Sequence, residues 1–164
     1  MDRDLQIIDL IEKNPGIKFR EMMRETGMKN GVLSYHTRKL EKSGVVKVER
    51  SSRKTRFYPL GITNEESVLI RSLRQETPRQ ILLLLLETDL VFNKIVEKVK
   101  KSQSTVSIYL SQLINDDLIE FKIIDLKKVF SIKNKKIVRN AINKYHPTLI
   151  ERSADCLADI FNSL

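Results

Sequence analysis

Apolar residues at the start of the chain recur with the spacing of an amphipathic helix. Leu5, Ile8 and Ile11 fall at every third position, with Ile7 beside them. The cluster Asn14-Pro15-Gly16 follows, and residues of these types end helices. We therefore predict a first helix that stops at this cluster.

Two further helices are predicted directly after it. A short helix over residues 20–26 is followed by a tight turn and a longer helix over residues 30–43. The longer helix places Leu33, Thr37 and Leu40 at helical spacing, which makes them its buried stripe.

The pattern then changes to the alternation typical of strands. Residues 45–48 and 56–58 are rich in valine and aromatic residues, and the polar segment 50–54 lies between them. This arrangement predicts a β-hairpin with a basic tip. The unit is therefore helix, helix, turn, helix, hairpin.

The same unit occurs a second time along the chain. The constant shift that brings Phe19 onto Phe92, called the repeat offset below, superimposes seven pairs of identical residues without a gap. The identical pairs are Ile8/Ile81, Leu10/Leu83, Phe19/Phe92, Ser34/Ser107, Leu40/Leu113, Lys54/Lys127 and Phe57/Phe130. Apolar positions coincide as well, and an internal repeat of this kind indicates two copies of one fold.

The second unit has its own helix and turn signals. Thr77-Pro78-Arg79-Gln80 combines an N-cap, a proline in the first turn and a glutamine, which predicts a helix that starts after Thr77. Helices are expected over residues 93–100 and, with Ser102 as N-cap, to residue 115. A hairpin over residues 118–132 is expected to turn at residues 125–127.

Helices are also predicted outside the two units. A capping box at Thr63 opens a connecting helix to about residue 75. A helix over 134–145 is expected to break at His146-Pro147, and a last helix over 148–162 follows. Its apolar seam, Ile150, Ala154, Leu157, Phe161 and Leu164, is suited to packing on another helix.

These elements predict a mainly α fold with small β-hairpin wings. The expected divisions are a first domain over 1–61, a connecting helix over 62–77, a second domain over 78–133 and C-terminal helices over 134–164. In the second unit Leu82, Leu85 and Leu86 replace polar residues, so that its first helix is apolar all round and must be covered by other helices of the chain or by a second subunit.

The net charge of the chain indicates what kind of partner it binds. Thirty Lys and Arg against 21 Asp and Glu give a net charge of +9 and a pI near 9.7, which favours a polyanion. The single cysteine, Cys156, excludes an intrachain disulfide, and no apolar run approaches the length of a bilayer span. We expect a cytoplasmic, nucleoid-associated protein.

Two segments carry a resemblance to a known superfamily. Residues 31–46 resemble the recognition helix and first wing strand of ArsR/MarR-like transcriptional regulators, and residues 101–113 resemble the same segment. Two such units in one chain are similar to the tandem winged helix-turn-helix regulators common in archaea. The resemblance implies two tandem winged helix-turn-helix domains, although such domains also serve as protein-interaction modules.

The outward face of the first long helix and the tip of its wing are the candidate DNA-binding residues. With Leu33 pointing inward, the 100° turn per residue places polar and basic residues outward, on a face that fits a major groove. The candidates of the first unit are Lys29, Asn30, Gly31, Ser34, Tyr35, Arg38, Lys39, Lys42, Arg50, Arg53, Lys54 and Arg56. The wing residues are expected on the backbone or in the minor groove.

The second unit is expected to contribute fewer base contacts. Its outward helix face carries mostly serine and is followed by Asp116-Asp117, so that phosphate contacts dominate. Its candidates are Lys100, Lys101, Ser102, Gln103, Ser104, Ser107, Ser111, Lys127 and Lys128. The first unit, with the larger net positive charge, is therefore the expected reader of sequence.

The sequence offers no catalytic or metal-binding pattern. Two histidines in opposite halves of the chain, His36 and His146, and one cysteine do not provide zinc spacings, and no phosphate-binding glycine fingerprint occurs. We predict a non-enzymatic, sequence-specific regulator of double-stranded promoter DNA, without cofactor or metal, acting as a homodimer that blocks or recruits the basal transcription machinery. The alternatives are a sequence-independent architectural DNA-binding protein and a protein-interaction scaffold.

Overall fold

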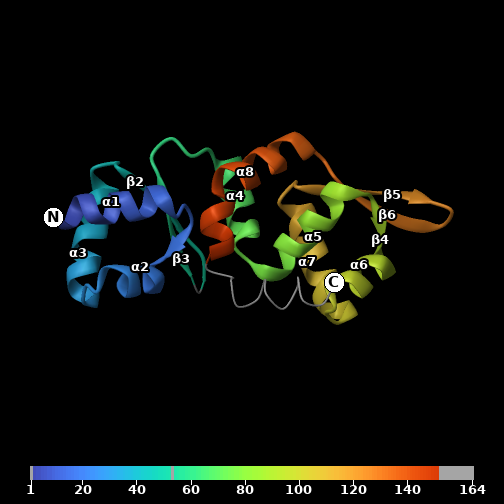
Figure 1. The fold of residues 1–164 in the computed structure, drawn as a ribbon, viewed down its shortest axis with the longest axis horizontal. Helices are drawn as coiled ribbons and strands as arrows, with labels where there is room; N and C mark the ends of the chain where they lie inside the picture. Colours follow the sequence, from blue (N-terminus) through green and yellow to red (C-terminus); the bar gives the residue numbers. More distant parts are fainter. Residues whose placement is uncertain (1, 53, 152–164) are drawn as a thin grey trace. The chain divides into compact units, whose positions relative to one another are not determined.

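The computed structural model describes residues 2–52 and 54–151 and divides the chain into two compact units. The first unit comprises residues up to Ser67 with residues 147–151, and the second comprises Val68–His146. Each unit is built around three helices and a small sheet of three strands (Figure 1).

The first unit begins with three helices and two strands in the predicted order, with one short strand added. Its elements are α1 (Arg3–Lys13), β1 (Ile17–Lys18), α2 (Phe19–Thr26), α3 (Asn30–Lys42), β2 (Val46–Arg50) and β3 (Thr55–Pro59). The sheet is antiparallel with the order β1-β3-β2. The sequence prediction missed β1, because so short a strand shows no periodicity.

The core of the first unit forms where the three helices meet the sheet. Its buried residues are Ile7, Ile11, Ile17, Met22, Leu33, Leu40, Val46 and Phe57. Leu5 shares the helical spacing of Ile8 and Ile11 but lies outside the buried face of α1, since it is 60% exposed. At 100° per residue Leu5 lies about 200° around the helix from Ile7, which is the buried centre of the stripe.

The second unit repeats this order. Its elements are α5 (Glu76–Glu87), β4 (Leu90–Val91), α6 (Phe92–Val99), α7 (Gln103–Asn115), β5 (Ile119–Ile124) and β6 (Lys127–Ile132), with the sheet order β4-β6-β5. The repeat offset carries both ends of β1, α2 and α3 onto those of β4, α6 and α7. The internal repeat is therefore confirmed as a structural repeat.

The backbone conformation of the first unit recurs in the second unit even at positions where glycine is replaced. Gly27 and Gly44 have positive φ angles of 69° and 76°, and the residues at the equivalent positions of the second unit, Lys100 and Asp117, have φ angles of 58° and 62°. A side chain at positive φ is unfavourable because Cβ approaches the backbone. The second unit thus keeps two left-handed helix ends without the residue that adopts them most easily.

Two predicted helix boundaries, at residues 77 and 146–147, were wrong. Helix α5 begins at Glu76, so that Thr77 is buried inside its first turn rather than capping it. Pro78 is still tolerated, because the first N–H groups of a helix have no intrahelical partner.

Helix α8 (Lys135–Glu151) continues through the predicted break at His146-Pro147. Proline removes only one helical hydrogen bond, and the bonds of the neighbouring turns can maintain the helix. The predicted seam lies outside the residues whose side chains the structure describes.

The connecting helix α4 (Asn64–Leu73) starts at the predicted capping box. The hydroxyl of Thr63 accepts a hydrogen bond from the backbone N–H of Glu66 at 3.1 Å. The apolar residues that α5 has gained over α1 are largely covered within the chain, because Leu82 and Leu85 are fully buried. A second subunit is not needed to bury them.

Candidate nucleic-acid interface

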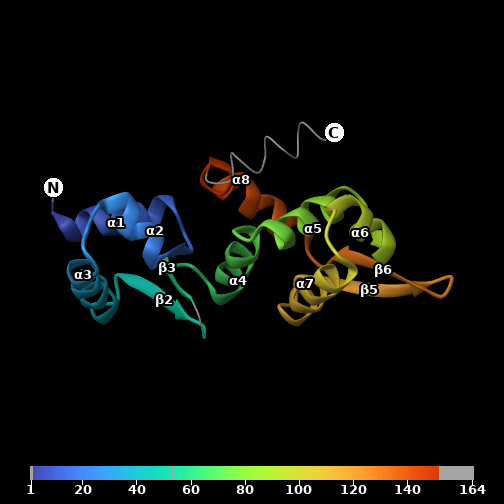
Figure 2. The same cartoon turned by 90° about the horizontal axis from the view of Figure 1, so that it is seen from below.

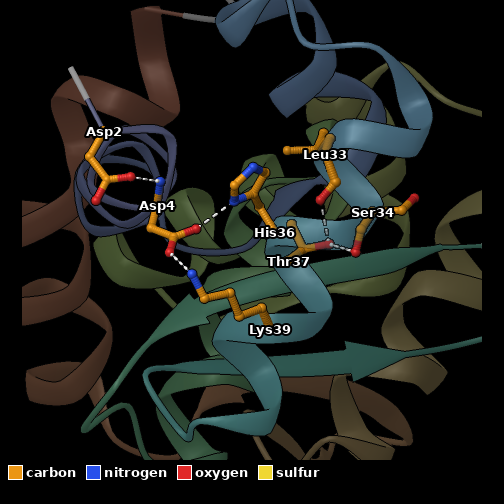
Figure 3. A network of polar contacts seen from close by, with 7 residues as sticks. All are labelled: Asp2, Asp4, Leu33, Ser34, His36, Thr37 and Lys39. Atoms are coloured by element: carbon orange, nitrogen blue, oxygen red, sulfur yellow. Dashed lines mark hydrogen bonds and ion pairs between the residues drawn. The ribbon is translucent and has the colours of Figure 1, made fainter.

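Helix α3 is fixed in the first unit by one buried face. Leu33, Thr37 and Leu40 are buried as predicted. The hydroxyl of Thr37 donates to the backbone carbonyl of Leu33 at 2.9 Å, with a second contact of 3.2 Å to that of Ser34 (Figure 3). The buried hydroxyl is therefore satisfied inside the helix, and no other element has to provide a partner.

The opposite face of α3 is exposed. Gly31, Tyr35, Arg38, Lys39 and Lys42 all lie on it. Arg38 forms no ion pair with the part of the chain that the structure describes, so its guanidinium is available to a base edge or a phosphate.

The start of α3 places further predicted residues near its free N–H groups. Lys29 is the N-cap residue and caps with its backbone only, while the amide oxygen of Asn30 accepts a hydrogen bond of 3.1 Å from the hydroxyl of Ser34. Lys29 and Asn30 are exposed, and the N-terminus of a helix favours an anion.

Lys39 is engaged by an acidic residue from another helix. The carboxylate of Asp4, near the start of α1, lies 2.6 Å from Nζ of Lys39 and 2.6 Å from Nδ1 of His36 (Figure 3). The hydrogen bond from Lys39 and then the one from His36 hold the pKa of Asp4 below its usual range, and Asp4 in turn raises the pKa of Lys39. The network anchors α3 to α1 and occupies the ammonium group of Lys39.

The tip end of β2 carries a similar pair. Both guanidinium nitrogens of Arg50 donate to the carboxylate of Glu41 on α3, at 2.6 and 2.7 Å. The pKa of Glu41 is lowered and that of Arg50 is raised by this hydrogen bonding. A fork-to-fork pair fixes geometry, and here it ties β2 to α3.

The wing prediction needs one correction. Arg56 is only 4% exposed, and its guanidinium donates to the backbone carbonyl of Gly16 at 2.9 Å. The side chain of Arg56 points into the unit and therefore links β3 to Gly16, the residue before β1, rather than facing a ligand. Lys54 is exposed at the tip, and Arg53 lies outside the described residues.

A groove of about 380 Å³ separates α3 from the wing. Arg38 lies on its helix wall and Arg50 and Lys54 on its wing wall, while Lys18 and Arg20 line the end beside β1 and α2. Sequence reasoning missed Lys18 and Arg20, because they reach the groove from β1 and the first turn of α2 rather than from α3 or the wing. Cations therefore lie on each side of the groove, and the carboxylate of Glu41 lines it as well.

The second unit offers a different face. Ser107 and Ser111 are exposed on α7 and, with Lys127 and Lys128, border a groove of about 690 Å³. Lys100, Lys101, Gln103 and Ser104 are exposed around the start of the helix. The hydroxyl of Ser102 accepts from the backbone N–H of Thr105 at 3.2 Å, which confirms it as the N-cap.

The described residues contain no group of three side chains that could hold a metal ion. Among the helices of this part of the chain, none combines the length and the apolar character that a bilayer span needs. His36 is held by Asp4, as described above. Cys156 lies outside the described residues.

Two winged helix-turn-helix domains in tandem define the class of this protein. Residues 2–47 match the model of the family described as winged helix-turn-helix DNA-binding, and residues 75–120 match that of the bacterial regulatory protein arsR family. Each match covers the three helices of one unit.

The chain is similar to an uncharacterised HTH-type transcriptional regulator of Methanocaldococcus jannaschii, with 26% identity over 121 residues. The alignment covers 74% of this chain but 31% of that relative, so the chain spans about a third of its length. The two family matches therefore support DNA-binding winged helix-turn-helix domains.

Two solved structures are similar to about half of this chain. HlyU from Vibrio cholerae is 21% identical with a TM-score of 0.45, covering 50% of this chain and 89% of that one. The transcriptional repressor BigR from Xylella fastidiosa is 17% identical with a TM-score of 0.46, covering 51% of this chain and 85% of that one.

Proposed function

We propose that this chain is a sequence-specific regulator that binds double-stranded promoter DNA, with the first unit as the main reader of sequence. The observation that carries the proposal is the exposed cationic face of α3 beside a groove with cations on both walls. In this arrangement α3 enters the major groove, and a phosphate strand passes between α3 and the wing.

The residues take different roles within this proposal. Arg38 reads a base edge, with Ser34 and Tyr35 beside it, while Lys18, Arg20 and Lys54 hold phosphates. Lys42, Lys29 and Asn30 extend the phosphate contacts at the ends of α3. Lys39 and Arg50 contribute only when they leave Asp4 and Glu41.

The domain divisions of the proposal follow the sequence analysis, with winged domains over 1–61 and 78–133 joined by a connecting helix. We also propose a homodimer, because a two-fold symmetric protein reads paired half-sites. The regulator would act in the cytoplasm at the nucleoid, by blocking or recruiting the basal transcription machinery, and no chemical reaction is assigned to it.

The proposal is tested by selecting bound duplexes from a random pool with the purified full chain at about physiological salt, which suppresses weak phosphate-only binding. An enriched motif is the expected result, and its symmetry reports the dimer. Retention without enrichment favours the architectural alternative and overturns sequence-specific reading. No retention overturns DNA binding and favours the interaction scaffold.

Single substitutions separate reading from phosphate binding. Arg38→Ala is expected to relax preference at one base position and to cost about 1–3 kcal/mol, while Lys54→Ala weakens all sequences equally and lowers the salt slope by about one. The matched control is Ser111→Ala, since Ser111 occupies on α7 the position that Arg38 occupies on α3. Equal effects of Arg38→Ala and Ser111→Ala would contradict the assignment of the first unit as reader.

A further inference from the structure

The grooves of the two units are equivalent in position and different in chemistry. Each lies between the third helix and the wing, and most of their lining residues are related by the repeat offset. The equivalent pairs include Phe19/Phe92, Ser34/Ser107, Thr37/Leu110, Arg38/Ser111, Glu41/Ile114 and Phe57/Phe130. The first unit therefore serves as an internal reference for what the second has changed.

The changes remove charge from the helix wall and add apolar surface. Ser111 and Ile114 replace Arg38 and Glu41, so that α7 presents no ionic group to the groove. Phe121 on β5 adds a ring that is 39% exposed and lies 5.9 Å from the ring of Phe130. On the helix side, a phosphate strand seated here would meet the hydroxyl of Ser111 and the apolar side chain of Ile114, where the first unit offers the guanidinium of Arg38.

Cations remain on the other walls of the groove. Lys127 and Lys128 come from β6, and Lys94 comes from α6. Nζ of Lys128 lies 4.5 Å from the centre of the Phe121 ring, so the ammonium covers one end of the apolar surface. An apolar floor bordered by ammonium groups and the hydroxyls of Ser107 and Ser111 is complementary to a molecule with an apolar body and an anionic head.

We propose that this groove is a binding site for a small amphipathic anion, such as a carboxylate or sulfonate on an aliphatic or aromatic body. Its volume of about 690 Å³ lies within the range of small-molecule sites. Leu110, Ile114 and Phe121 contact the body, and the lysines of β6 contact the head.

Occupancy of the groove would have a consequence for DNA. The anion would cover Ser107, Ser111, Lys127 and Lys128, which are the groups with which the second unit would otherwise approach a phosphate backbone. Binding of the anion and DNA contact by the second unit would then exclude each other. This regulatory step rests on the proposed function, whereas the site itself does not.

The site is tested on the full chain with 8-anilinonaphthalene-1-sulfonate, an aromatic sulfonate whose fluorescence rises in apolar surroundings. The expected result is saturable binding of one molecule per chain and displacement by decanoate. Ile114→Glu should weaken binding at least tenfold, because it brings a carboxylate to the groove. The variant should fold, since Glu41 occupies the equivalent position of the first unit.

Two further variants keep the test decisive. Phe121→Val copies Val48 of the first unit at a partly exposed position and should also weaken binding at least tenfold. Ile108→Ser is the matched control, because Ile108 is 66% exposed on α7 but does not line the groove, and its affinity should equal that of the unmodified chain.

Several outcomes would overturn the site. The first is the absence of saturable binding, and the second is that Ile114→Glu binds the sulfonate as tightly as the unmodified chain does. The third is self-association of the chain that Ile114→Glu abolishes, which would make a second copy the occupant of the groove. Binding of the sulfonate without selection of a DNA motif would leave the site standing and refute only the proposed function. Selection of a DNA motif without sulfonate binding would refute the site and leave the proposed function standing.

Discussion

Replacing Glu41 by glutamine should make the first unit bind DNA more tightly. Glu41 holds the guanidinium of Arg50 through two hydrogen bonds of 2.6 and 2.7 Å, at the border of the groove proposed for the phosphate strand. Arg50 must leave this carboxylate before it can contact a phosphate. Glutamine has the same length as glutamate but no charge, so it releases Arg50 with little change of shape.

The size of the effect follows from the exposure of the pair. The side chains of Glu41 and Arg50 are 34% and 59% exposed, and pairs of this kind contribute about 0.2–1 kcal/mol. Removing the competition therefore strengthens DNA binding by about 1.4- to 5-fold at fixed low salt. If Arg50 adds one phosphate contact, the slope of log affinity against log salt steepens by about 0.9, which is about 3.5-fold more loss between about 50 and 200 mM salt.

The assay is fluorescence anisotropy of a labelled duplex titrated at several salt concentrations. Glu12→Gln is the matched control, because it changes the net charge equally from an exposed position on α1 that forms no ion pair with the described part of the chain. Unchanged affinity and slope in Glu41→Gln would refute the reasoning. An equal gain in Glu12→Gln would show that net charge alone acts, rather than release of Arg50.

Three further predictions concern stability. Lys100→Gly should raise the free energy of unfolding by about 1 kcal/mol in chemical denaturation, because glycine adopts the left-handed helix end as Gly27 does in the first unit, and no gain would contradict this. Arg56→Ala should lower the free energy of unfolding by about 2 kcal/mol, because the hydrogen bond of a buried guanidinium is lost. The salt slope of DNA binding should stay constant, and a lower slope would show that Arg56 contacts DNA after all. Asp4→Asn should cost about 1 kcal/mol near pH 7. Because the pKa of Asp4 is lowered in the folded chain, the difference from the unmodified protein should start to shrink below about pH 4 and should vanish only once the pH lies below the lowered pKa of folded Asp4. A difference in thermal unfolding that does not shrink at all as the pH falls below about 4 would refute an ionic contribution of Asp4 through Lys39.

Local periodicity was enough to predict the elements of this fold that depend on neighbouring residues. The spacing of Leu33, Thr37 and Leu40 defined which face of α3 is buried, because the 100° turn of a helix fixes the relation between position and face. The repeat offset predicted a second copy with the same elements. Both patterns can be recognised in the sequence alone, because neither depends on tertiary contacts.

Packing of the folded chain controls which charged residues are available. Arg56 and Lys54 are equally basic in sequence, but one is buried against Gly16 and the other is exposed. Asp4 on α1 pairs with Lys39 on α3, and no local pattern predicts a partner so far along the chain. Burial and pairing are properties of the packed chain.

The grooves likewise depend on tertiary structure as well as on sequence. Their lining combines the third helix, the wing and a short strand, and the strands β1 and β4 have no periodicity of their own. In the second unit, α7 lies beside the β5–β6 hairpin, which projects past the helices of its unit (Figures 1 and 2). The replacement of Glu41 by Ile114 is visible in the sequence, but only the packing of helix against wing turns it into a change in the chemistry of a site.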